Sequence, residues 1–301
     1  MPRLSPAAKA ARRLGIGSSD VATILGISPY KDATPFGLWL EKTGQLDEVD
    51  ELETPEQTLG HEFESTLVRL AVAELVKEGI LGAGRLEIPD LPLRLGTVVD
   101  GVIALASLDG IYHVGDAAYV LEAKHVGVGM HDGWVDDDDG IPQHVRVQTQ
   151  WQLLVSGAVA AFVSAVVMGR WRIYRVNPDR DFWPLMLEAA ASFWQRVRTG
   201  HAPDLDGSAR ALAYLERKYP APPESVIAEM PDDVDALVEQ HIAAQATIKD
   251  LEDQRTVVGQ KIRDAIGAAG VDEFIGDERK ATWKANKSGK RVLLTKRVRG
   301  A

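Results

Sequence analysis

The segment of this sequence that is most suggestive of chemistry is a short apolar stretch that carries one acid and one base, Val120-Leu121-Glu122-Ala123-Lys124. Alternate side chains on a β-strand share a face, so we expect Glu122 and Lys124 to point the same way. A carboxylate can bind a metal ion, and a neighbouring ammonium can stabilise developing negative charge. The same spacing is also typical of an exposed ion pair, so neighbouring segments must decide between the two interpretations.

Two further acids stand out by their surroundings. Residues 54–77 show apolar residues at helical spacing, with Gly60 and Glu64 four apart on one face. We expect Gly60 to permit a close approach there and Glu64 to reach over it. Asp100 lies in an apolar strand pattern just before Gly101. Taken alone, Glu64 also fits a solvated helix acid, and Asp100 a surface turn.

The N-terminal segment suggests an anion site. Residues 2–13 are basic and rich in Ala, which predicts a short helix or an arm. Gly15-Ile16-Gly17-Ser18-Ser19-Asp20 then precedes an apolar run, which predicts a turn and a short helix capped by Ser18, Ser19 or Asp20. Free amides at a helix start suit an anion, although a plain N-cap explains the same residues.

The other elements of the first two thirds follow from periodicity and turn residues. A β-hairpin is expected over 105–119, with Asp109-Gly110 or Gly115-Asp116 in its turns. A helix over 141–156 carries Gln148. The acid run 136–139 is interpreted as a solvated loop without a metal, and 201–223 as a linker. The remaining predictions are helices at 34–43 and 181–198 and strands at 85–89, 93–96, 158–168 and 171–176.

The C-terminal part has a different character. Residues 232–266 form a long charged helix pattern whose apolar residues recur every three or four positions, broken by His241 and Arg255, which favours a helix–helix or coiled-coil contact. Two strands, 280–284 and 291–296, are expected to form a hairpin at Ser288-Gly289. All 44 acidic residues precede Arg279, and the segment after Glu278 contains nine basic residues. The hairpin either packs on the acidic body or meets DNA, with Trp283 as a stacking or packing residue.

Composition sets outer limits on function. The chain has 301 residues, 45% hydrophobic and 26% charged, as in soluble globular proteins. The absence of cysteine excludes thiolate metal sites and disulfides. There is no apolar run long enough for a membrane span and no secretory signal pattern, so a cytoplasmic enzyme, with no membrane association, is the expectation.

Six short motifs occur in order over about residues 12–200: Gly15-Ile16-Gly17-Ser18-Ser19-Asp20, Leu25-Gly26-Ile27-Ser28-Pro29-Tyr30, Gly60-x-x-x-Glu64, Val99-Asp100-Gly101, Leu121-Glu122-Ala123-Lys124, and Ile141-Pro142 with Gln148-x-Gln150. Together they resemble the YqaJ-type viral recombinase family, the alkaline exonucleases of phages related to phage lambda exonuclease. That family belongs to the PD-(D/E)XK nuclease superfamily. The resemblance implies an α/β fold with a restriction-endonuclease-like core, in which helices flank a mixed central sheet. The long helix and basic β-hairpin would be added at its C-terminus.

The resemblance also implies roles for the candidate residues. Glu64, Asp100 and Glu122 would be metal carboxylates, joined by the carbonyl of Ala123, and Lys124 would be the catalytic lysine. Gln148 would order the site. Mg²⁺ suits such hard oxygen ligands, and Mn²⁺ can substitute. Two ions about 4 Å apart would activate water and stabilise the leaving oxygen.

A terminal 5′ phosphate would lie near Arg13 and Ser19, with Arg12 and Ser18 as alternatives. One position departs from the family pattern. A small hydroxyl residue often stands two before the aspartate, whereas Val98 stands two before Asp100, so a phosphate contact is lost there unless Thr97 supplies it.

These observations predict a Mg²⁺-dependent 5′-to-3′ exonuclease of duplex DNA that leaves 3′ single strands in phage-type recombination in a bacterial host cell. An endonuclease, a single-strand nuclease and a non-catalytic DNA-binding assembly protein remain alternatives. We expect residues 1–225 to form the nuclease domain and 226–301 a C-terminal extension. A homo-oligomer, a trimer by family analogy, and a phage single-strand annealing protein are the expected partners besides DNA.

Overall fold

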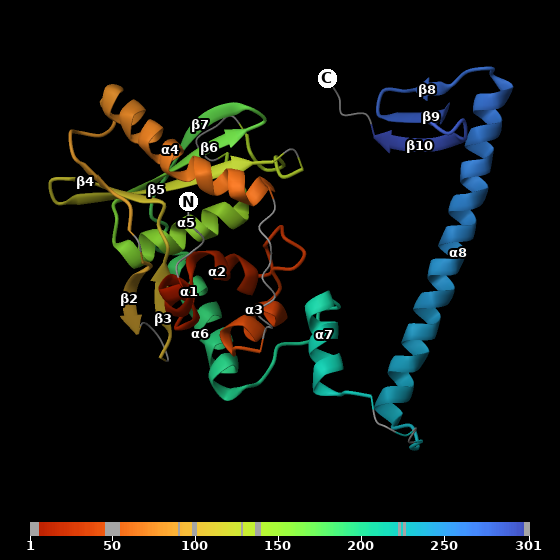
Figure 1. Ribbon diagram of the computed structural model, residues 1–301, viewed down its shortest axis with the longest axis horizontal. Helices are drawn as coiled ribbons and strands as arrows, with labels where there is room; N and C mark the ends of the chain where they lie inside the picture. Colours follow the sequence, from red (N-terminus) through yellow and green to blue (C-terminus); the bar gives the residue numbers. More distant parts are fainter. Residues whose placement is uncertain are drawn as a thin grey trace. The chain divides into compact units, whose positions relative to one another are not determined.

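The strand β5 (Ala117–Val126) lies at the centre of a five-stranded sheet with the order β1-β4-β5-β6-β7 (Figure 1). It pairs antiparallel with β4 and parallel with β6. The turn between β4 and β5 is Gly115-Asp116, where Gly115 has a positive φ of 57°, as tight hairpin turns require. This mixed sheet confirms the predicted fold class and resolves the two turn alternatives.

The computed structural model describes residues 6–45, 55–89, 91–97, 101–127, 129–135, 140–221, 224 and 227–297. The chain divides into two compact units, Met1–Ala221 and Pro222–Ala301. The other strands of the first unit are β1 (Arg85–Glu87), β2 (Leu93–Thr97), β3 (Ile103–Ala106), β4 (Gly110–Val114), β6 (Ala160–Val167) and β7 (Arg170–Val176). Its helices are α1 (Pro6–Arg13), α2 (Ser18–Ile24), α3 (Pro35–Lys42), α4 (Pro55–Lys77), α5 (Gln143–Ser156), α6 (Trp183–Thr199) and α7 (Ala209–Lys218).

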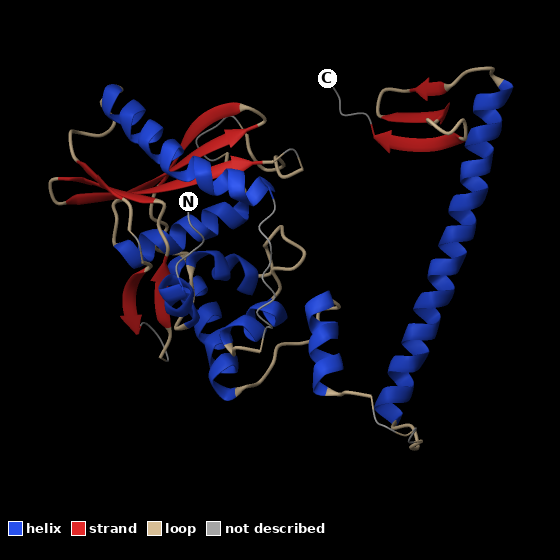
Figure 2. Cartoon of the chain, viewed as in Figure 1, coloured by secondary structure: helices blue, strands red, loops and turns tan. Residues whose placement is uncertain are grey.

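Helices cover both faces of the five-stranded sheet (Figure 2). On one face Leu121 and Ala123 of β5 pack in a cluster with Leu67 and Val68 of α4. On the other face Val120 of β5 belongs to a larger core built with α2, α3, α5 and α6. Side chains alternate along a strand, so Glu122 and Lys124 share the face of Val120. The predicted common orientation of these two residues is therefore confirmed.

One expectation about the first unit is wrong. The segment predicted to be a linker contains α7, which begins where Ser208 Oγ accepts a hydrogen bond from the amide of Ala211 at 3.1 Å. The helix is held by Tyr214, whose ring lies 5.5 Å from that of Phe36 and 6.1 Å from that of Trp39. The Pro and Gly residues on either side of this helix had been interpreted as signs of a linker. In α4 the buried stripe is Leu67, Val68, Ala71 and Leu75, whereas Leu59, Phe63 and Leu70 are exposed, so only part of the apolar pattern faces the core.

The second unit consists of the long helix α8 (Asp232–Ala268) and a three-stranded antiparallel sheet of β8 (Glu273–Ile275), β9 (Arg279–Ala285) and β10 (Arg291–Arg297). The predicted hairpin is confirmed as β9 and β10, and β8 was not anticipated because it is only three residues long. Trp283 packs: the guanidinium carbon of Arg291 lies 3.8 Å from the centre of its ring. Its ring also lies close to Gly267 of α8. It is therefore a packing residue of this unit.

No helix within the described residues combines the length and apolar character needed to cross a membrane.

Candidate active site

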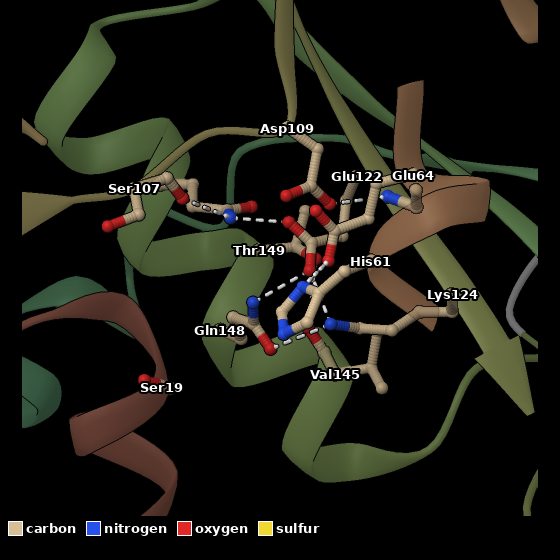
Figure 3. A network of polar contacts seen from close by, with 12 residues as sticks. Ser19, His61, Glu64, Ser107, Asp109, Glu122, Lys124, Val145, Gln148 and Thr149 are labelled. Atoms are coloured by element: carbon tan, nitrogen blue, oxygen red, sulfur yellow. Dashed lines mark hydrogen bonds and ion pairs between the residues drawn. The ribbon is translucent and has the colours of Figure 1, made fainter. Parts of the chain in front are cut away.

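Glu122 is the centre of a buried polar network (Figure 3). It lies on β5 with its side chain only 2% exposed. Its Oε1 accepts a hydrogen bond from Gln148 Nε2 at 2.7 Å, and its Oε2 accepts one from Gln152 Nε2 at 2.6 Å. Both amides come from α5, one turn apart, so they reach the strand from the same helix face. A buried carboxylate needs such donors, and the helix is placed to provide them.

Lys124 supplies the positive charge of the site. Its ammonium group contacts Glu122 Oε1 and lies 3.3 Å from Gln148 Oε1. Burial lowers the pKa of this lysine, but the carboxylates of Glu122 and Asp109 outweigh that effect and raise it above its usual value. Its side chain is still 28% exposed. The structure therefore presents a charged ammonium that remains within reach of a bound molecule.

Asp109 belongs to the same cluster, although the sequence analysis treated it only as a turn residue. It directly precedes β4, and its Oδ2 accepts a hydrogen bond from the amide of Ala123 at 2.8 Å. Although the residue as a whole is only half-buried, its carboxyl group is surrounded by protein atoms. Burial raises the pKa of this carboxyl well above its usual range. The carboxylates of Glu122 and Glu64 raise it further, and Lys124 opposes them.

Glu64 reaches the cluster from α4 (Figure 3). Its Oε1 lies 2.9 Å from Nδ1 of His61, one turn earlier on the same helix. The negative charge of Glu64 is one of the causes that raise the pKa of Asp109. No protein atom lies within 4 Å of the place of a β-carbon at Gly60, so no described part of the chain itself makes a close approach there.

Gln152 is the second functional residue that sequence reasoning missed. It is completely buried, and its Nε2 contacts both Glu122 and the carbonyl oxygen of Ser107, the latter at 3.3 Å. It thereby ties α5 to β5 and to the segment that carries Asp109. The available signal was its place four residues after Gln148, which puts both amides on one face of the helix.

Gln150 serves another purpose. It is also buried, but its Oε1 accepts hydrogen bonds from the amide of Asp179 at 2.9 Å and from Trp183 Nε1 at 3.0 Å. Its Nε2 donates to the carbonyl of Asn177 at 2.7 Å. It fixes the connection between β7 and α6 and takes no part in the Glu122 network.

Asp100 and Val98 lie outside the described residues. Ala123 is in β5 between Glu122 and Lys124, as expected. The chemistry of the remaining donors fits a divalent cation, because the carboxylates of Glu122 and Glu64 help to raise the pKa of Asp109 and all three groups offer hard oxygen ligands. Within the described ranges, however, no group of three His, Asp or Glu side chains is placed to hold a metal ion.

The N-terminal candidates form a separate group. Arg12 Nη2 donates to Ser19 Oγ at 3.2 Å, whereas Ser19 lies apart from the Glu122 cluster (Figure 3). The N-cap of α2 is Gly17 and not one of the three predicted residues. Asp20 is the third residue of the helix, and its Oδ2 accepts from the amide of Gly17 at 2.8 Å and pairs with the buried Lys42 at 2.6 Å. Ser18 is buried, and Arg13 is the last residue of α1.

Known proteins share features with this chain. The family model of the YqaJ-like viral recombinase domain matches residues 9–77. The Bacillus subtilis (strain 168) protein named Uncharacterized protein YqaJ is 28% identical over 277 residues, which cover 91% of this chain and 81% of that protein. The structure of LHK-Exo in complex with dAMP matches 71% of this chain and 97% of that chain, at 17% identity and a TM-score of 0.50. A second structure, of the alkaline exonuclease LHK-Exo from Laribacter hongkongensis, has the same identity and coverage and a TM-score of 0.49.

At these identities the likeness to solved structures concerns the fold. The matched N-terminal segment contains three of the six motifs on which the resemblance was based: the Gly/Ser turn, the segment 25–30 and Gly60-x-x-x-Glu64. The resemblance to the YqaJ-like viral recombinase family is confirmed by the family model over residues 9–77 and by the YqaJ protein of Bacillus subtilis.

Proposed function

We propose that this protein is a metal-dependent exonuclease that degrades duplex DNA in the 5′-to-3′ direction and leaves 3′ single strands for recombination. The resemblance to the YqaJ-like viral recombinase family supports a nuclease role in recombination. The observation that carries the proposal is the buried carboxylate of Glu122, held by Lys124, Gln148 and Gln152 beside the carboxyl of Asp109. Acids and one ammonium in a partly enclosed site match the requirements of phosphodiester hydrolysis.

In this proposal the side chains of Asp109, Glu122 and Glu64, which are not gathered around one point in the metal-free chain, would move together to hold Mg²⁺. Mn²⁺ could substitute for it, and the Ala123 carbonyl would be a further ligand. When bound, one or two such ions supply an activated water and neutralise charge on the phosphate. Lys124 stabilises the negative charge that develops around phosphorus. Gln148 holds the ammonium of Lys124 against Glu122, and Gln152 fixes the other oxygen of Glu122, so neither group has to reorganise when charge develops.

Asp109 takes here the role that the sequence analysis gave to Asp100. It carries the raised pKa expected of a carboxyl near other ligand carboxylates. Ser107 stands two residues before Asp109, where the family pattern calls for a small hydroxyl residue, while Val98 stands two before Asp100. Asp100 remains a prediction.

The remaining predictions keep their place in the proposal. Arg12, Arg13, Ser18 and Ser19 recognise a terminal 5′ phosphate, which a guanidinium can hold at two points. Residues 1–225 act as the nuclease domain. The active form is a homo-oligomer, a trimer by family analogy, that works with a single-strand annealing protein.

The test uses linear duplex DNA labelled at either end, with and without a 5′ phosphate, and a closed circular duplex as control. We expect Mg²⁺-dependent release of nucleotides from the 5′ end of the linear form alone. Cutting of the closed circle would identify an endonuclease, and no cutting of any substrate would favour the assembly protein.

Recognition of the end is tested separately. Arg13→Ala and Arg12→Ala should narrow the difference in rate between phosphorylated and hydroxyl ends. An equal loss on both substrates would assign these arginines to general backbone contacts.

A further inference from the structure

The helix α8 presents a stripe of side chains that the described residues of its own unit leave uncovered over most of its length. The sheet β8–β10 packs only at the C-terminal end of the helix, where Ile266 is buried and Leu293 lies beside Gly259. Before that point the apolar residues are exposed, with Leu237 at 62% and Leu251 at 57%. A helix of 37 residues with an exposed apolar stripe is not stable by propensity alone and calls for a partner.

The spacing of the stripe specifies the form of that partner. The α8 stripe consists of positions separated alternately by three and four residues: Val234, Leu237, His241, Ala244, Ile248, Leu251, Arg255, Val258, Ile262 and Ala265. A repeat with a mean of 3.5 residues keeps one seam facing a partner helix that winds around it with a left-handed twist. The stripe therefore fits another α-helix with the same repeat.

The charges of α8 are divided along its length. The part before Gln254 is strongly acidic and holds one lysine, Lys249; its acids are Asp232, Asp233, Asp235, Glu239, Asp250, Glu252 and Asp253. The part from Gln254 onward carries Arg255, Lys261 and Arg263 against Asp264 alone. Two copies side by side in the same direction would place acid against acid. Two copies in opposite directions place the acidic part of each beside the basic part of the other.

We propose that α8 pairs with α8 of a second copy of this chain in an antiparallel coiled coil centred between Lys249 and Asp250. In this register Ile248 faces Leu251 of the second copy, and Leu237 faces Ile262. Arg255 faces Ala244, whose small side chain leaves room for the long arginine to reach solvent. His241 faces Val258. A parallel pair would oppose Arg255 to Arg255 and His241 to His241 in the seam, where like charges are unfavourable.

Cysteine cross-linking tests the register directly, because the chain contains no cysteine of its own. Ala244→Cys and Arg255→Cys are made as separate full-length proteins, mixed, and oxidised. A disulfide requires α-carbons within about 7 Å. The antiparallel register brings these two positions together between copies, while eleven residues of helix keep each about 16 Å from its own counterpart.

We expect the mixture to form a disulfide-linked dimer and each variant alone to form little. The control mixture replaces Ala244→Cys with Ala246→Cys, which lies off the α8 stripe and should not cross-link with Arg255→Cys. Cross-linking of each variant with itself would show a parallel pair. Equal yields in the control, or no cross-link at all, would also overturn the proposal.

A second measurement does not depend on oxidation. The double variant Ile248→Lys/Leu251→Lys places cations at the centre of the seam and should lower the mass of the particle measured by light scattering. Ala243→Lys/Ala246→Lys adds the same charge off the stripe and should leave the mass unchanged. An unchanged mass in both variants, together with absent cross-links, would exclude pairing through α8.

Discussion

The two units of this protein differ in where their charged side chains lie. In the first unit the carboxylate of Glu122 is buried and every one of its oxygens has a donor, while the carboxyl of Asp109 is held beside it. In the second unit the charges lie on the surface of a small sheet, where Lys280 stands opposite Lys296, and Arg279 opposite Arg297.

The difference follows from what each arrangement costs. Taking an ionised group out of water costs several kcal/mol unless partners compensate, so a buried group of acids is poorly explained by stability and is typical of a reaction centre. Like charges across an exposed sheet cost only a few tenths of a kcal/mol to about 1 kcal/mol. Such a surface can be kept for weak contacts that depend on salt.

The largest effect is expected from Lys124→Ala. Lys124→Ala removes the ammonium that contacts Glu122 and that, in the proposed function, faces the substrate. The cleavage rate should fall at least about 10²-fold. The fold should persist because Glu122 keeps the amides of Gln148 and Gln152. Single-turnover digestion of duplex is compared with the melting temperature and with DNA binding. A rate within about tenfold of wild type would contradict the role of Lys124.

The next effect separates Asp109 from Asp100. Asp109→Asn should weaken Mg²⁺ binding, measured by calorimetry, and reduce cleavage about 10²-fold or more. Asp100→Asn is the matched variant on the neighbouring candidate. Loss of Mg²⁺ binding in the Asp100 variant alone would show that Asp100 is the ligand and Asp109 is not. Loss in both variants would show that both aspartates bind the metal.

Asp109 also predicts how metal-free stability depends on pH. Because burial and nearby carboxylates raise its pKa in the folded chain, the folded protein keeps this proton at pH values where the unfolded chain has released it. The stabilisation is complete below the ordinary pKa of an aspartate and is lost as pH rises through the raised value. Denaturant unfolding in EDTA should show this decline in wild type, and Asp109→Asn should flatten it. If the stability of both proteins changed with pH in the same way, Asp109 would not be the cause of the decline.

The sequence predicted the parts of the site whose signal is local. Alternation along β5 predicted that Glu122 and Lys124 share a face, whereas Glu64 and Gln148 were assigned to the site by the family resemblance. Asp109 was missed because Asp-Gly is so typical of a turn, and only the pairing of β4 with β5 brings it beside Ala123. Gln152 was missed because a glutamine in a helix is ordinarily solvated. Its burial depends on the packing of α5 against the sheet, which no local pattern encodes.

A smaller effect is expected from Gln152→Leu. It leaves one oxygen of Glu122 and the carbonyl of Ser107 without a buried donor, which should lower the free energy of unfolding by about 1–3 kcal/mol. Gln148→Leu removes a comparable bond to Glu122 at a half-buried position, where water can replace it. Its destabilisation should be the smaller of the two in urea titrations. A larger destabilisation by Gln148→Leu would mean that the hydrogen bonds of Gln152 are not the more important ones for holding Glu122.

The smallest effects concern the basic sheet of the second unit, which we expect to contact the phosphates of duplex DNA. Truncation after Ala268 removes β8–β10 and should weaken duplex binding and flatten its dependence on salt, while Mg²⁺ binding and slow cleavage of short substrates remain. An unchanged slope of log affinity against log salt would assign the sheet to protein contacts.

Substitution of single lysines tests more directly whether the basic sheet contacts DNA, because two of its lysines have different neighbours. Lys296 stands opposite Lys280, whereas Lys284 pairs with Glu273 at 2.6 Å. Lys296→Gln removes a like-charge contact and should raise stability slightly, by at most about 1 kcal/mol. It should also reduce the slope of log affinity against log salt by about one, as for one lost phosphate contact.

Lys284→Gln removes a partner of Glu273, so it should lower stability slightly and leave that slope nearly unchanged. If both variants changed the slope equally, total charge alone would govern binding. If neither did, the cations opposed across β9 and β10 would have no part in holding DNA.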